Sequence, residues 1–220
     1  MGGLATSARV LYQAFGLRGY DCKGVRIECG VVILEVGLRD CDIRCPSCRT
    51  SNVVRRGAEE RHFRHVPLGR KIVLLEVDVP RVFCVECRVI RQVRLRFADA
   101  RRSYTRAFER YVFDLSRKMT MQDVVEQLLV GWDTVKDIVK RNLERSFKKP
   151  KLRKLRRIAI DEISIGHGHQ YLTVVLDLAT GAVVFVGDGK GAEALDPFWK
   201  RLWASHARIQ AVAIDMSKAY

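Results

Sequence analysis

"IAIDEISIG" (residues 158–166) and "AVAIDMSKAY" (residues 211–220) are two short apolar runs that each reach an aspartate, Asp161 in the first and Asp215 in the second. The segments between them predict two further strands joined by tight turns, followed by a helix over residues 192–205. A strand that is reached through a crossover helix lies parallel to a strand already in the sheet. If the first and fourth strands are neighbours, the two carboxylates lie side by side.

Paired carboxylates are the feature of this segment that points to chemistry. Two adjacent negative charges resist ionising together unless a cation is present, and Mg²⁺ prefers carboxylate and water oxygens. Two such ions activate a water or hydroxyl group and stabilise the leaving oxygen of a phosphodiester. Taken singly, each aspartate is better explained as the end of a strand or a turn, and that alternative stays open.

Two cysteine pairs predict a structural zinc site. Cys45 and Cys48 form one CxxC motif, and Cys84 and Cys87 form another. Two such turns supply the four sulfurs of a tetrahedral zinc site, and the β-branched runs between them suggest a β-hairpin with the site at its end. Unbound core cysteines and a redox pair are the alternatives.

Three other residues near these pairs are candidate replacements for a zinc ligand. They are Cys41, His62 and His65, although "RHFRH" (residues 61–65) favours imidazoles at a strand edge.

Residues 120–147 predict two helices separated by a short turn at Gly131, with Asp133 placed to cap the second helix. In a basic setting this pattern suggests a helix-turn-helix, whose second helix enters the major groove of DNA. An ordinary helical hairpin is the alternative. The candidate DNA-binding residues are the polar positions of the second helix: Thr134, Lys136, Lys140 and Arg141.

Composition favours a nucleic-acid partner. The net charge is +15, from 40 Lys and Arg residues against 25 Asp and Glu residues, and 48% of the residues are hydrophobic. Such a surplus usually indicates a polyanionic partner. Neither a signal peptide nor an apolar stretch of about 18 residues occurs, so we expect a cytoplasmic, nucleoid-associated protein that makes no membrane contact.

These patterns predict a multidomain α+β protein. The expected segments are a weakly ordered N-terminus (1–20), a β-rich zinc-binding domain (21–98), a helical DNA-binding domain (99–147), a basic linker (148–157) and an α/β segment (158–220).

The order of these parts resembles the DDE transposases of bacterial insertion sequences, in the group with a cysteine zinc-binding domain ahead of a helix-turn-helix. The segments that carry the resemblance are "CPSC" (45–48), "RHFRHVPLGRKIVLLEVDVPRVFCVEC" (61–87), "GWDTVKDIVKR" (131–141), "IAIDEIS" (158–164), "YLTVVLDLATGAVV" (171–184) and "AVAIDMSKAY" (211–220).

The resemblance implies a function and a catalytic site. Residues 158–220 would be the N-terminal half of an RNase H-like domain, with Asp161 and Asp215 as the first two acids of a metal-binding triad. The family binds terminal inverted repeats in double-stranded DNA and cuts and rejoins the DNA with two Mg²⁺ ions, which require the full triad. The third acid does not occur before Tyr220, so we expect a C-terminally truncated, catalytically incomplete copy, with self-association left open.

Two other functions remain as alternatives. A non-catalytic DNA-binding protein or repressor would bind the element ends without cutting them. A zinc-ribbon protein that binds RNA ranks last, because it gives the paired aspartates no role.

Overall fold

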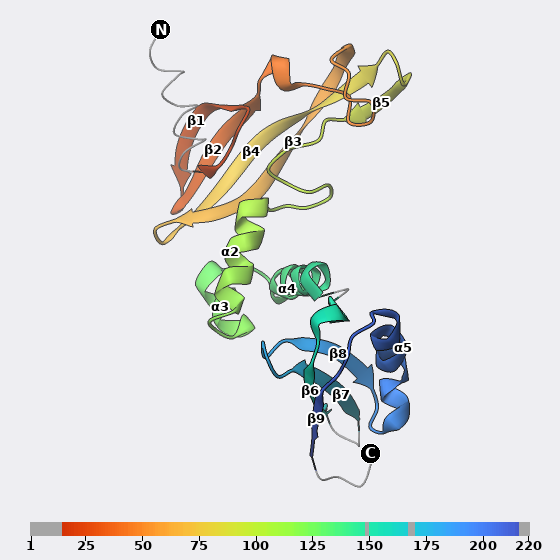
Figure 1. Cartoon of the computed structure of the whole chain (residues 1–220). Coiled ribbons are helices and arrows are strands. Elements are labelled where there is room, and N and C mark those ends of the chain that lie inside the picture. The colour runs from red at the N-terminus through yellow and green to blue at the C-terminus, as the bar shows by residue number, and fades with distance from the viewer. Residues whose placement is uncertain (1–14, 148–149, 167–169, 216–220) are drawn as a thin grey trace. The chain divides into compact units, whose positions relative to one another are not determined.

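The computed structural model describes residues 15–147, 150–166 and 170–215. The chain divides into two units, one ending at Arg141 and one beginning at Asn142 (Figure 1). Among the residues that the structure describes, no helix is long and apolar enough to cross a membrane. The predicted fold class, with β-rich, helical and α/β parts, is confirmed. Most of the segment expected to be weakly ordered, and residues 216–220 of the second quoted run, lie outside the described residues.

Five strands form the sheet of the first unit, in the order β1-β2-β4-β3, with β5 also paired to β4. Strands β2 and β4 are parallel, and the other pairs are antiparallel. The strands are β1 (Tyr20–Glu28), β2 (Val31–Leu38), β3 (Val53–Leu68), β4 (Lys71–Cys84) and β5 (Val89–Gln92).

Alternation along β4 builds the core of this sheet. Val73, Leu75, Val77 and Val79 occur at every second position and are all buried. Successive side chains of a strand point to opposite faces, so this pattern directs one face of β4 inward. Each fully buried side chain of this kind contributes about 1.5–3 kcal/mol to stability relative to an exposed one.

Three helices follow the sheet in the sequence: α2 (Arg106–Ser116), α3 (Met121–Leu128) and α4 (Trp132–Phe147). The helical pair predicted over residues 120–147 is therefore confirmed. Their shared core includes Phe108, Val124 and Ile138. Helix α3 begins with a capping box, in which Thr120 and Asp123 each accept a hydrogen bond from the other's backbone N–H.

The turn between α3 and α4 differs from the prediction in one detail. Helix α4 begins at Trp132, so Asp133 lies inside the first turn and is not the cap. A carboxylate at that position still interacts favourably with the positive end of the helix dipole. Leu129 ends α3 in the left-handed conformation (φ 51°), where glycine is the usual residue.

Backbone hydrogen bonds join the helices to the sheet. The Arg64 N–H on β3 donates to Ser103 O over 2.8 Å, and the Thr105 N–H donates back to Arg64 O over 2.9 Å. The segment that leads into α2 is therefore paired with the edge strand β3 as a short parallel bridge. Thr105 then caps α2, because its side chain accepts a hydrogen bond from the Phe108 N–H.

The second unit contains a four-stranded sheet in the order β8-β7-β6-β9, with β6 and β9 parallel. The predicted antiparallel meander, crossover helix and parallel fourth strand are confirmed. The elements are β6 (Arg157–Ser164), β7 (Tyr171–Asp177), β8 (Val183–Asp188), α5 (Asp196–Ala204) and β9 (Ala211–Ile214). Phe198 and Leu202 of α5 pack on Ile158 and Ile160 of β6, which covers one face of the sheet.

The segment predicted as a basic linker differs from that prediction where the structure describes it. Leu152 and Leu155 are buried in the core of the second unit, with Leu152 starting a turn of 3₁₀ helix. The two leucine side chains pack into this core, while the lysines and arginines around them stay exposed to solvent. The described part of this segment thus belongs to the second unit and contributes to its core.

Candidate metal centres and nucleic-acid interface

The two CxxC motifs meet because the hairpin of β3 and β4 brings them together. Val53, the first residue of β3, pairs with Cys84, the last residue of β4. The motif just before β3 and the motif at the end of β4 therefore lie at the same end of the hairpin. The 35 residues that separate Cys48 from Cys84 (84 − 48 − 1) are occupied largely by these two long strands.

The four sulfurs have the spacing that a zinc ion requires. All four Sγ atoms lie within 4.8 Å of one another, with 3.9 Å between those of Cys45 and Cys87 and 3.5 Å between those of Cys48 and Cys84. Tetrahedral Zn–S bonds separate the sulfurs by about 3.8 Å. The residues therefore fit a structural zinc site closed by four thiolates.

The electrostatics of this cluster also favour a cation. The backbone N–H groups of Cys48 and Ser47 lower the pKa of the Cys45 thiol to about 6. Hydrogen bonding with the sulfurs of Cys48 and Cys84 is the main cause that raises the pKa of the Cys87 thiol to about 12. Four thiols this close cannot all ionise unless a positive charge compensates them, and a bound metal ion deprotonates its thiol ligands.

The candidate replacement ligands lie outside this group of four sulfurs. Cys41 is exposed, with its Sγ 3.9 Å from Asp42 Oδ2. His65 does not lie at an exposed strand edge: although β3 is an edge strand, this side chain is buried and its Nδ1 lies 2.8 Å from Thr105 Oγ1. Burial lowers the pKa of His65 to about 4.

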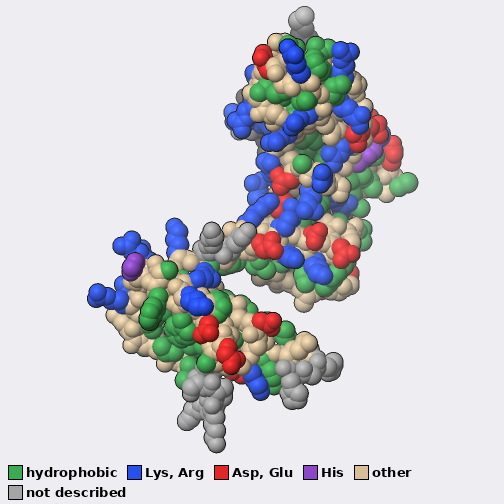
Figure 2. Space-filling model, turned by 90° about the vertical axis from the view of Figure 1, so that its right-hand side faces the viewer, with side chains coloured by type: hydrophobic (Ala, Val, Ile, Leu, Met, Phe, Trp, Pro, Cys, Tyr) green, Lys and Arg blue, Asp and Glu red, His purple; other side chains and the backbone are tan. Residues whose placement is uncertain are grey.

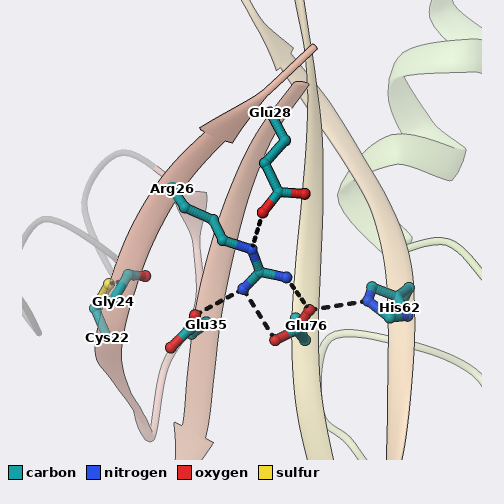
Figure 3. Close-up of polar contacts among 7 residues, drawn as sticks. All are labelled: Cys22, Gly24, Arg26, Glu28, Glu35, His62 and Glu76. Atoms are coloured by element: carbon teal, nitrogen blue, oxygen red, sulfur yellow. Dashed lines mark hydrogen bonds and ion pairs between the residues drawn. The ribbon is translucent and has the colours of Figure 1, made fainter. Parts of the chain in front are cut away.

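His62 belongs to a row of ionic contacts across the outer face of the first sheet (Figure 3). The Arg26 guanidinium on β1 contacts the carboxylates of Glu28, Glu35 and Glu76. His62 Nε2 on β3 lies 3.0 Å from the same Glu76 carboxylate. Chiefly through its hydrogen bond to Arg26, Glu76 has a pKa below its usual range.

Glu60, His62 and Glu76 also bring their ligand atoms within 4.8 Å of one another. However, Arg26 already compensates the charge of Glu76. We therefore assign this cluster a structural role, in which ionic contacts link four neighbouring strands.

Helix α4 presents some of the predicted DNA-binding residues to solvent. Lys136 and Lys140 are exposed, and Thr134 is half-buried. Val135 and Ile138 on the opposite side of the helix are buried in the helical core. The two lysines are therefore available for a partner.

Arg141 differs from its prediction as a DNA contact. Its guanidinium hydrogen-bonds the Tyr104 hydroxyl and lies 3.4 Å from the buried Glu109 carboxylate, so it is engaged within the helical core. The partner, Glu109, was missed from the sequence. It falls on the same helical stripe as Phe108 and Val112, and a carboxylate on a buried stripe requires a partner of opposite charge.

The register of the second sheet places the two aspartates. Strands β6 and β9 pair Ile160 with Ile214, and each aspartate follows that pair by one residue. Neighbouring strands lie about 4.8 Å apart, so Asp161 and Asp215 occupy adjacent positions on the same sheet face. Both are exposed, and α5 covers the opposite face of the sheet. Adjacent carboxylates of this kind fit the oxygen ligands that Mg²⁺ prefers.

Three family models match successive segments of the chain. The model described as "zinc-finger of transposase IS204/IS1001/IS1096/IS1165" matches residues 42–87. The model described as "Helix-turn-helix domain of transposase family ISL3" matches residues 93–141, and one described as "Transposase" matches residues 158–220.

Curated relatives show the same likeness over most of the chain. The transposase for insertion sequence element IS1001 of Bordetella parapertussis is 32% identical over 181 residues, which is 82% of this chain and 43% of that protein. The transposase for insertion sequence element IS1557 of Mycobacterium tuberculosis is 34% identical over 175 residues, 78% of this chain and 39% of that protein. The chain thus spans about two-fifths of the length of these relatives.

Proposed function

Since the chain belongs to the ISL3 family of insertion-sequence transposases, we propose that it acts in DNA transposition. In this proposal it binds the terminal inverted repeats of its element and contributes Asp161 and Asp215 to Mg²⁺-dependent strand cleavage and transfer. The observation that supports the proposal most is the register of β6 and β9, because Asp161 and Asp215 each follow the paired residues Ile160 and Ile214.

The two aspartates would hold Mg²⁺ through their carboxylate oxygens. When bound, the ions polarise the attacking hydroxyl or water and the leaving oxygen of a phosphodiester. The protein's own contribution is to fix the spacing of the carboxylates, since both follow directly from paired strand positions. Both aspartates are exposed among the described residues, which leaves room for a DNA strand to approach them.

We expect divalent metal binding at these aspartates to be measurable without DNA cleavage. Titration with paramagnetic Mn²⁺ should broaden the NMR signals of residues near Asp161 and Asp215, with an affinity on the order of millimolar, because few protein ligands are involved. Asp161→Asn should remove this broadening.

Asp188→Asn is the matched control, because Asp188 is also exposed but ends β8, at the opposite edge of the same sheet. Equal broadening in the wild-type chain and in Asp161→Asn would contradict the metal site.

DNA binding is proposed to depend on the exposed side of α4. Lys136 and Lys140 are one helical turn apart and both exposed, as phosphate contacts beside a major-groove helix require. We expect Lys136→Gln with Lys140→Gln to weaken binding to the terminal repeat that flanks the reading frame about 10-fold or more. The slope of log affinity against log salt should fall by about 2.

The matched control removes two positive charges from the second unit, by Lys200→Gln with Arg208→Gln. Both residues are exposed. Fluorescence anisotropy at several salt concentrations measures the affinities. An unchanged salt slope in the α4 variant would show that these lysines do not contact the DNA backbone.

A non-catalytic DNA-binding protein or repressor is the second candidate. It is favoured because the zinc cluster and the helix-turn-helix lie in the first unit, whereas the two aspartates lie in the second. Sequence-selective DNA binding without Mn²⁺ binding would support this candidate over the transposase.

A further inference from the structure

An arginine-lined cleft lies in the first unit, and neither Lys136 nor Lys140 of α4 is among its lining residues. Its volume is about 770 Å³. Five of the residues that line it are arginines: Arg61, Arg91, Arg94, Arg101 and Arg106. Figure 2 shows that Lys and Arg side chains are widely spread over the visible face of the protein.

Ion pairs within the protein neutralise only part of this positive charge. The two carboxylates that line the cleft are Glu59 and Asp99. Asp99 pairs with Arg106 over 2.7 Å, and Glu59 pairs with Arg81, which lies outside the lining, over 3.2 Å.

The remaining arginines have no carboxylate partner among the described residues. Arg91 donates to Ser47 Oγ over 2.9 Å, and Arg61 stacks on the Phe63 ring with 4.8 Å to its centroid. Arg94 and Arg101 are exposed and make no ion pair with any residue that the structure describes. The cleft therefore carries a surplus of positive charge that an anionic partner would neutralise.

Backbone conformation gives a second, independent observation. Arg101 in the cleft has a φ of 62°, and Arg49 and Arg88 have φ values of 62° and 53°. The last two each follow the second cysteine of a CxxC motif, and their N–H groups bond to the carbonyls of Cys45 and Cys84.

Glycine adopts this left-handed conformation without cost, whereas for other residues it costs about 1–2 kcal/mol. All three arginines are exposed. Of the three, Arg101 lines the cleft, so a charged side chain is exposed there at a position where the backbone favours glycine.

We propose that this cleft binds the sugar-phosphate backbone of duplex DNA, as a contact additional to that of α4. The inference rests on the proposed DNA-binding function and adds a second surface to it. Guanidinium groups suit phosphates because their planar donors form paired hydrogen bonds with phosphate oxygens. Such contacts position a protein on DNA without reading its sequence.

The location of the cleft favours DNA over other anionic partners. Pro46, within the first CxxC motif, lines one part of it, and Arg106, the first residue of α2, lines another. The cleft thus lies between the candidate zinc site and the start of the helix-turn-helix, within one unit.

The test is a triple variant, Arg91→Gln with Arg94→Gln and Arg101→Gln, in the full 220-residue chain. We expect its affinity to fall by a similar factor for the terminal-repeat duplex and for a scrambled duplex of the same composition. The salt slope should fall by about 2–3, close to one for each phosphate that the variant no longer neutralises.

Equal removal of charge from the second unit provides the matched control, by Lys190→Gln with Lys200→Gln and Arg208→Gln, all at exposed positions. If the two triple variants have the same salt slope while the wild-type chain binds DNA, the cleft is not a DNA surface but the proposed function stands. If the wild-type chain binds neither duplex, both proposals are overturned. Weaker binding of the terminal-repeat duplex alone would also overturn a backbone contact.

Arg101→Gly separates binding from folding. Because glycine relieves the left-handed strain, we expect the melting temperature to stay the same or rise while DNA affinity falls several-fold. Unchanged affinity in this variant, together with an unchanged triple variant, would exclude the cleft.

Discussion

Cys84→Ala is expected to abolish zinc binding and to unfold the end of the β3–β4 hairpin where the four cysteines meet. Cys84 is buried and is both a strand residue paired with Val53 and one of the four sulfurs. Its removal leaves three sulfurs, which hold zinc far less tightly. Binding free energies of structural zinc are of order 10 kcal/mol, so this is the largest single effect that we expect.

Metal analysis and limited proteolysis measure this effect. The wild-type chain should carry close to one equivalent of zinc, and the variant should carry little and be cut within residues 41–53. Cys41→Ala is the matched control, because Cys41 is exposed and outside the four-sulfur group. Zinc retained by Cys84→Ala but lost by Cys41→Ala would overturn the assignment of the ligands.

Acidification is expected to destabilise the first unit through His65. Burial lowers its folded-state pKa to about 4, against about 6.5 in an unfolded chain. Between these values the unfolded chain binds a proton that the folded chain does not, so the free energy of unfolding falls as the pH falls. The full decrease, reached below the folded pKa, is about 3 kcal/mol.

Urea unfolding between about pH 4.5 and 7.5 tests this expectation, since that window covers the range between the two pKa values. Because zinc thiolates also bind protons in this range, the informative quantity is the difference between the wild-type chain and His65→Gln. That difference should narrow as the pH falls. Parallel curves for the wild-type chain and His65→Gln would show that His65 does not titrate as described.

The sequence predicted best where periodicity and local chemistry agree. The strands around Asp161 and the helices around Gly131 follow directly from their apolar spacing, and the two CxxC motifs come together as a shared metal site predicts. The parallel register of β6 and β9 followed from the crossover helix between them.

The predictions that differed from the structure depend on tertiary contacts that no local pattern carries. Arg141 lies among polar positions of α4, but it turns inward to a carboxylate 32 residues earlier in the chain (141 − 109), Glu109. His65 is polar, yet the Thr105 hydroxyl gives its imidazole a hydrogen-bonding partner within the core. The burial of Leu152 in the core was not predicted, because basic residues surround it in the sequence.

The short backbone bridge between Arg64 and the segment before α2 has a consequence for the shape of a target site. It ties the segment that leads into α2 to the sheet whose β3–β4 hairpin carries the cysteine cluster, and α2 shares its core with α4. If DNA binds both the arginine-lined cleft and α4, it must therefore present its phosphates to the two surfaces at one fixed spacing along the duplex.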